Sequence, residues 1–97
     1  MTVTRRTKPA ARRYRVAGDV AHREIEGQTL LLTSSESGLL TLNATGQFVW
    51  RRLTRGADVP AIVRAFRRAF HVSEAVAARD VTAFLNALES RKMIRRA

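Results

Sequence analysis

The 97-residue sequence has no cysteine, and this absence removes several classes of function at once. Disulfide bonds, thiol catalysis and metal sites with cysteine ligands are excluded. The apolar runs are only a few residues long, far short of a membrane span, and the basic N-terminus is not followed by the apolar stretch of a secretory signal. We therefore expect a cytoplasmic protein that does not enter the membrane.

Side chains suited to catalysis or metal binding are few. The two histidines, His22 and His71, lie far apart in the sequence and fit ordinary surface or strand positions. The serines at positions 34, 35 and 37 fall in a polar turn with no base nearby, and the chain lacks a glycine-rich phosphate loop. The sequence predicts a protein that is not an enzyme, with no catalytic residue, no metal and no cofactor.

Acidic residues are also scarce, and their distribution divides the chain. There are 18 basic and 8 acidic residues, for a net charge of +10, and residues 1–15 hold six of the basic residues and no acid. Residues 16–97 are left with a net charge of only +4. We therefore expect a basic, disordered arm over residues 1–15 and one folded domain over residues 16–97. The arm is either a solvated terminus or a weak, non-specific contact for nucleic acid and other polyanions.

Alternating apolar residues and turn signals predict three strands, over about residues 20–26, 29–33 and 39–42. The link Glu26-Gly27-Gln28 is short enough for a tight hairpin, and residues 34–38 form a polar turn. The strands therefore form an antiparallel meander.

The apolar spacing then becomes helical. A first helix is expected over about residues 44–55, a second begins after Asp58 with Pro60 in its first turn, and a third begins after Ser73. Asn43, Asp58 and Ser73 are favourable N-caps. A three-stranded antiparallel sheet followed by three helices is an α+β fold, and it is winged-helix-like.

That outline makes a winged-helix DNA-binding protein the alternative function. Arg64, Arg67 and Arg68 on the second helix could contact phosphates, although exposed arginines also serve solubility. The third helix argues against base recognition because it begins with Glu74 followed by small apolar residues.

Two segments and a set of spaced apolar positions carry a family resemblance. The step Leu42-Asn43-Ala44-Thr45-Gly46 is the most specific, because a strand ends there, Asn43 caps a helix and Gly46 allows close packing. Residues 23–94, about three quarters of the chain, thereby resemble the PqqD-like family. The second segment is residues 23–32. The spaced positions are Asp80 and the apolar residues Val49, Trp50, Val59, Ile62, Val63, Val81, Phe84, Leu85 and Leu88.

The resemblance implies a peptide-recognition element. Members bind the leader of a ribosomally made precursor peptide as an extra strand along the third strand, in a groove against the third helix. They act as peptide chaperones or adaptors beside a radical enzyme, a cyclase or a leader peptidase. The resemblance leaves open the precursor, the enzyme and the oligomeric state, a homodimer included.

The predicted peptide-binding residues follow from this arrangement and from the pairing capacity of an edge strand. Residues of the third helix form the wall, and we expect most of its apolar residues to be core and one or two to line the groove. Basic residues near that helix are expected either to meet acidic leader side chains or to remain solvated charges. The edge residues are Leu39, Leu40, Thr41 and Leu42; the wall residues are Val81, Phe84, Leu85 and Leu88; the basic residues are Arg79, Arg91 and Lys92.

Overall fold

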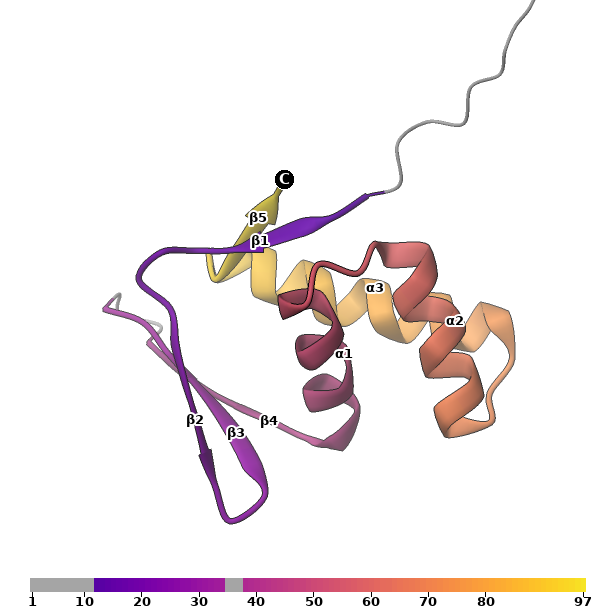
Figure 1. Cartoon of the computed structure of the whole chain (residues 1–97), viewed down its shortest axis with the longest axis horizontal. Helices are drawn as coiled ribbons and strands as arrows, with labels where there is room; N and C mark the ends of the chain where they lie inside the picture. The colour runs from indigo at the N-terminus through magenta and orange to yellow at the C-terminus, as the bar shows by residue number, and fades with distance from the viewer. Residues whose placement is uncertain (1–11, 35–37) are drawn as a thin grey trace, which may run out of the picture.

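The computed structural model describes residues 12–34 and 38–97 and contains five strands and three helices in these residues (Figure 1). Residues 1–11 of the predicted arm lie outside the described residues, as do residues 35–37 of the predicted polar turn. In chain order the elements are β1 (Tyr14–Val16), β2 (Ala21–Ile25), β3 (Gln28–Leu32), β4 (Leu39–Leu42), α1 (Ala44–Thr54), α2 (Val59–Phe70), α3 (Glu74–Ser90) and β5 (Ile94–Arg96).

The central sheet has the order β2-β3-β4, and both neighbouring pairs are antiparallel. The β2–β3 hairpin turns through Glu26 and Gly27, whose φ angles are 52° and 80°. Two successive positive φ angles define the turn type that matches the twist of the flanking strands, and glycine adopts such an angle without steric cost. The predicted tight hairpin and the antiparallel meander are both confirmed.

All three helices begin at the predicted caps. Asn43 Oδ1 accepts the Gly46 N–H at 2.9 Å, and Asp58 Oδ1 accepts the Ala61 N–H at 2.9 Å. Ser73 Oγ accepts the Val76 N–H at 3.2 Å. Each cap satisfies a donor that the first helical turn would otherwise leave unpaired.

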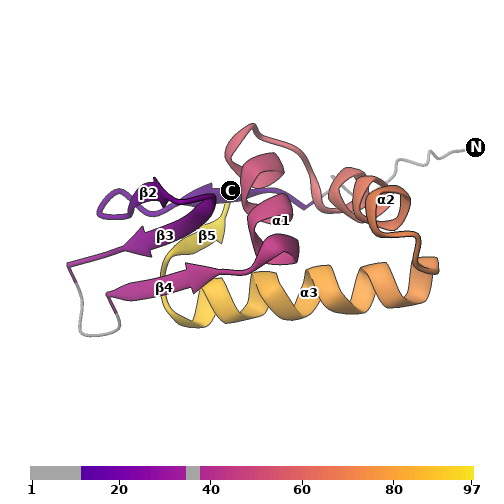
Figure 2. The same ribbon diagram turned by 90° about the horizontal axis from the view of Figure 1, so that it is seen from below.

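One face of the central sheet is covered by helices. On that face Leu31 and Leu42 are buried, Thr29 bonds to Gln47 of α1, and His22 stacks edge-on against Trp50. The opposite face is not covered by any described helix (Figure 2). The α+β prediction of three antiparallel strands followed by three helices is confirmed.

A second, two-stranded sheet was not predicted. β1 pairs antiparallel with β5, and Tyr14 of β1 is 7% exposed and part of the core. The carbonyl of Arg12 also accepts the Val59 N–H at 2.8 Å. Placing residues 12–15 in the arm was therefore wrong: they belong to the fold. The pairing partner lies about 80 residues away in the sequence, and a three-residue strand has too few positions to show a period.

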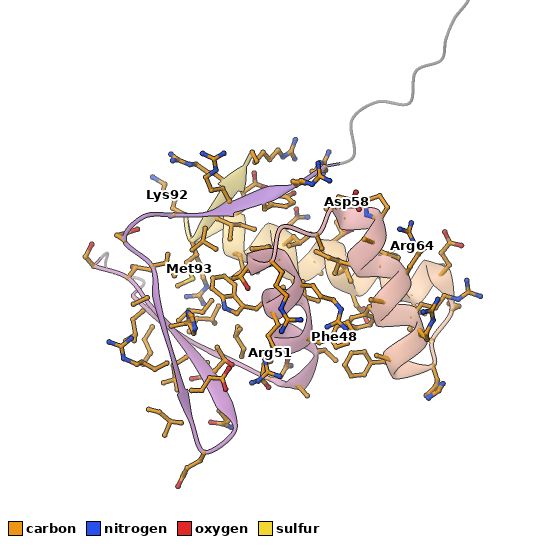
Figure 3. The ribbon with its side chains drawn as sticks, in the orientation of Figure 1. Phe48, Arg51, Asp58, Arg64, Lys92 and Met93 are labelled. Atoms are coloured by element: carbon orange, nitrogen blue, oxygen red, sulfur yellow. The ribbon has the colours of Figure 1, made fainter. Side chains whose placement is uncertain are left out.

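The C-terminal residues belong to this small sheet as well. Met93 is 0% exposed and Ile94 is 2% exposed, so both lie in the core. Lys92, directly before them, adopts a φ of 62°, and this left-handed conformation turns the chain out of α3 and into β5 (Figure 3). The C-terminal segment is therefore extended and packed rather than frayed.

None of the helices in residues 12–34 and 38–97 combines the length and the apolarity needed to cross a bilayer.

Candidate peptide-binding groove

The pairing register determines which backbone groups of β4 are free. Antiparallel partners alternate between pairs that exchange hydrogen bonds and pairs that do not. The Thr33 N–H donates to the Gly38 carbonyl at 2.8 Å, so residues 33 and 38 form a bonded pair. Two residues further along β4, Leu40 is again bonded to β3. Leu39 and Thr41 therefore direct their N–H and C=O groups away from β3, to the edge of the sheet.

The register of the β2–β3 hairpin independently shows which residues of β4 bond to β3. Its two-residue turn joins Ile25 to Gln28, which form a bonded pair in a hairpin of this kind. The backbone groups of the next residue, Thr29, then point to β4, where its partner is Leu42. Both arguments leave Thr41 unbonded to β3. Because β4 is the end strand of its sheet in the described residues, its outer edge can pair with an added strand.

A hollow of about 250 Å³ lies between this edge and α3. β4 runs beside the C-terminal half of α3 (Figure 2). Residues 40–43 line one side, and Phe84, Ala87 and Arg91 line the other. A small-molecule site usually measures about 300–1,000 Å³. The hollow is therefore better sized for one or two side chains of an extended segment than for a cofactor.

The structure divides the predicted wall residues between groove and core. Phe84 is half-buried and lines the groove, whereas Val81, Leu85 and Leu88 are 0–2% exposed and belong to the core. Those three side chains offer no free surface to a peptide. They pack in the core beneath the groove. Phe84 lies on one face of α3, and these three residues lie on an adjacent face.

The strand residues divide in a similar way. Leu40, Thr41 and Leu42 all line the groove, although Leu42 is only 4% exposed. Leu39 is 57% exposed and is absent from the lining. Successive strand side chains point to opposite faces, so Leu39 shares the uncovered face with Thr41. Leu39 therefore offers backbone groups rather than its side chain.

Among the basic residues, only Arg91 lines the groove. Its side chain is half-buried at the C-terminal end of α3. Arg79 pairs with Asp80 at 3.4 Å and is offset by about 140° around the helix from Phe84. Lys92 is exposed and is not part of the lining. The geometry brings one of the three predicted cations to the groove.

Two lining residues were not predicted as site residues. Asn43 was identified only as a helix cap, and Ala87 was not singled out at all. Ala87 could have been found from helical spacing, because Phe84, Ala87 and Arg91 follow each other at intervals of three and four residues. Nothing in the sequence distinguishes Asn43 from an ordinary cap.

The basic residues on α1 are engaged inside the fold. Arg51 forms an ion pair with Glu24 at 3.2 Å, and the guanidinium carbon of Arg52 lies 3.6 Å from the centre of the Phe48 ring. The ion pair partly neutralises the charge of Arg51, and the ring contact holds Arg52 against Phe48.

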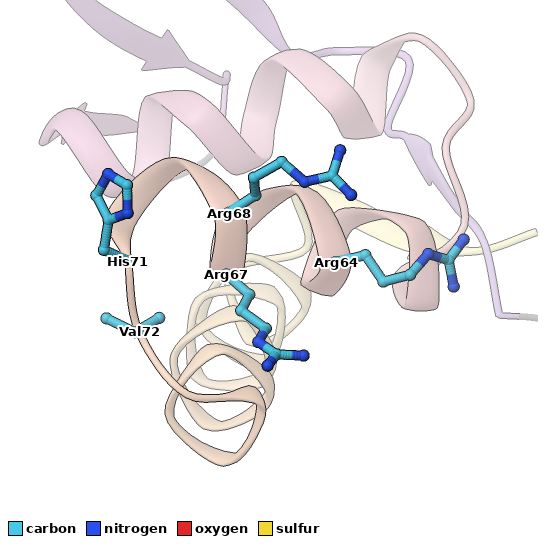
Figure 4. Close-up of a pocket in the computed structure, with 5 residues that line it drawn as sticks. All are labelled: Arg64, Arg67, Arg68, His71 and Val72. Atoms are coloured by element: carbon cyan, nitrogen blue, oxygen red, sulfur yellow. The ribbon is translucent and has the colours of Figure 1, made fainter.

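A larger hollow of about 500 Å³ lies along α2 and is lined by Arg64, Arg67, Arg68, His71 and Val72. The guanidinium ends of its three arginines lie apart from one another rather than converging on one point (Figure 4). An arrangement of this kind does not form a defined anion site. No group of three or more His, Asp or Glu side chains in the described part of the chain could hold a metal ion.

Comparison with known families identifies the family of the chain. A family model for coenzyme PQQ synthesis protein D (PqqD) matches residues 28–94. The chain belongs to the PqqD family. The match includes β3, β4, all three helices and the first residue of β5, and thus every residue that lines the groove. No curated protein matches the chain.

Two solved structures share the PqqD-like fold. One is TbiB1 in complex with the TbiA(beta) leader peptide, with a TM-score of 0.77 and 25% sequence identity over 82% of this chain and 93% of that chain. The other is lasso peptide synthetase B1 complexed with the leader peptide, with a TM-score of 0.78 and 20% identity over 84% of this chain and 96% of that chain. Both structures are complexes with a leader peptide, and neither they nor the family match supports the DNA-binding alternative.

Proposed function

We propose that this PqqD-family protein binds the leader segment of a ribosomally made precursor peptide and presents it to a modifying enzyme, without catalysing a reaction itself. The observation that supports this most directly is the hollow between the free edge of β4 and α3. A similar protein, TbiB1, is known in complex with a leader peptide.

The mode of binding follows from the register. A leader strand that pairs with the free groups of Leu39 and Thr41 extends the sheet by one strand. Its alternate side chains lie on the helix-covered face, next to Leu40 and Leu42, and reach Phe84. The hollow has room for one or two such apolar anchors. The remaining leader side chains lie on the uncovered face of the sheet.

A titration monitored by amide NMR tests this proposal. On addition of a synthetic leader peptide, we expect the largest shifts at residues 39–43 and at Phe84, Ala87 and Arg91. Backbone pairing and apolar burial together should give a dissociation constant between micromolar and nanomolar, or about −8 to −12 kcal/mol. Shifts concentrated on Arg64, Arg67 and Arg68 would mean that the peptide binds elsewhere.

Arg91 provides a second prediction. No ion pair joins its side chain to an acid in the described residues, so its charge is available to an acidic leader side chain at the end of the groove. Replacing Arg91 with glutamate should slow association with an acidic leader about tenfold at low salt and weaken the salt dependence. Stopped-flow measurements at several salt concentrations give both quantities.

Arg68→Glu is the matched control for this substitution, because it changes the net charge equally at an exposed position on α2. If the two variants slow association to the same extent, the effect comes from net charge alone and Arg91 has no local role.

A further inference from the structure

Gly46, in the first turn of α1, occupies a position where a larger residue does not fit. A Cβ atom at Gly46 would lie 2.9 Å from Cε1 and 3.4 Å from Cδ1 of Phe84. It would also lie 3.2 Å from Oδ1 of Asn43, which caps the helix. The φ angle of Gly46 is not positive, so its backbone does not require glycine. The requirement is one of space, and the Phe84 ring fills that space.

The Phe84 side chain therefore lies between Gly46 and the hollow beside β4. One edge of its ring rests on Gly46, and its side chain also lines the hollow beside β4. The ring thus forms a wall between Gly46 and the groove. The position of this wall determines how much of the 250 Å³ remains for an incoming side chain.

We infer that Gly46 is a positioning residue that holds the Phe84 ring back from the groove, so that the two residues together set the size of the leader side chain that the groove accepts. This inference rests on the proposed leader binding and specifies what the groove selects. A leader with a bulky apolar anchor is the substrate that this arrangement fits.

The physical argument concerns where the ring can move. A contact of 2.9 Å between carbon atoms is too short, so a methyl group at position 46 requires either the ring or the helix to shift. The start of α1 is held by the Asn43 cap and by the burial of Val49 and Trp50. The groove is the free volume next to the ring, so the ring moves into it and the space for an anchor decreases.

The test is Gly46→Ala, with Gly18→Ala as the matched control, because a Cβ at Gly18 meets no atom within 4 Å and its φ angle is not positive. The probes are three synthetic leader peptides that differ only at the groove-binding position, which holds phenylalanine, leucine or alanine. By calorimetry, Gly46→Ala should weaken binding of the phenylalanine and leucine peptides about tenfold. It should change binding of the alanine peptide about twofold or less, and Gly18→Ala should change none of the three.

A double-mutant cycle with Phe84→Ala shows whether the ring transmits the effect. In the Phe84→Ala background, Gly46→Ala should no longer weaken binding of the bulky peptides. An undiminished loss in that background, or an equal loss for all three peptides, overturns the inference. If Gly46→Ala does not fold by circular dichroism, Phe84→Ala alone decides. It should increase the affinity for the phenylalanine peptide relative to the alanine peptide, and an unchanged ratio of these two affinities overturns the inference.

Failure of the proposed function gives a different result. If the unmodified protein binds none of the peptides, leader binding is refuted. The inference that Gly46 and Phe84 set the size of the accepted side chain is then refuted as well. The aromatic NMR signals of Phe84 in Gly46→Ala then still show whether Gly46 positions the ring, because displacement changes these signals without any peptide present.

Discussion

Replacing Thr41 with proline is expected to weaken leader binding about 10- to 100-fold while leaving the protein folded. The register directs the Thr41 N–H to the open edge of β4, where it can donate to a leader carbonyl. Proline removes this donor. Removing the donor and leaving the leader carbonyl unpaired costs about 1–3 kcal/mol, a range that contains the 10- to 100-fold loss. Fluorescence anisotropy with a labelled leader measures the loss.

The reverse pattern is expected one residue earlier. Leu40 bonds to β3, so Leu40→Pro breaks the ladder inside the sheet and should lower the unfolding free energy by about 3 kcal/mol. Thr41→Pro removes only an edge donor and should cost under about 2 kcal/mol. Thr41→Val, which keeps the backbone donor and the side-chain shape, should bind almost normally. Loss of binding in Thr41→Val would show that the side chain, rather than the backbone, makes the contact.

Replacing Met93 with alanine is expected to cause a large loss of stability, although Met93 lies only four residues before the end of the printed sequence. Its side chain is 0% exposed, and its N–H donates to the Leu88 carbonyl at 3.0 Å. Truncating a buried methionine costs about 2–5 kcal/mol. For a domain of this size, that corresponds to a decrease in Tm of roughly 10–30 °C, measurable by circular dichroism.

Arg95→Ala is the control, because Arg95 lies in the same segment but is exposed. It should change the unfolding free energy by about 0.5 kcal/mol or less. A similarly small loss for Met93→Ala would contradict the placement of this segment in the core. Below its Tm, Met93→Ala should still bind the leader, since Met93 does not line the groove.

The helices and the central sheet could be predicted because their signals are local. Each helix is marked by a cap residue followed by helical apolar spacing, and the observed caps are the predicted ones. The β2–β3 hairpin is marked by a glycine in the short link between two strands. These features depend on residues within a few positions of each other, so the sequence is sufficient to find them.

The groove could be predicted only in part. The strand edge and Phe84 were expected, but separating Phe84 from Val81, Leu85 and Leu88 requires the orientation of α3 against the sheet. All four are apolar and lie on overlapping faces of one helix, so spacing alone cannot rank them. For the same reason, only the structure shows that Arg91 reaches the groove while Arg79 and Lys92 do not.

The sequence by itself determined the family, the α+β order of elements, the helix caps and the strand that offers its edge. Only the tertiary structure decided that β1 and β5 pair, that Gly46 faces Phe84, and that Thr41 rather than Leu40 has a free N–H. The physical reason is the range of the interactions. Caps and turns are local, whereas strand register and helix packing join residues far apart in the chain, and their geometry depends on how the whole core packs.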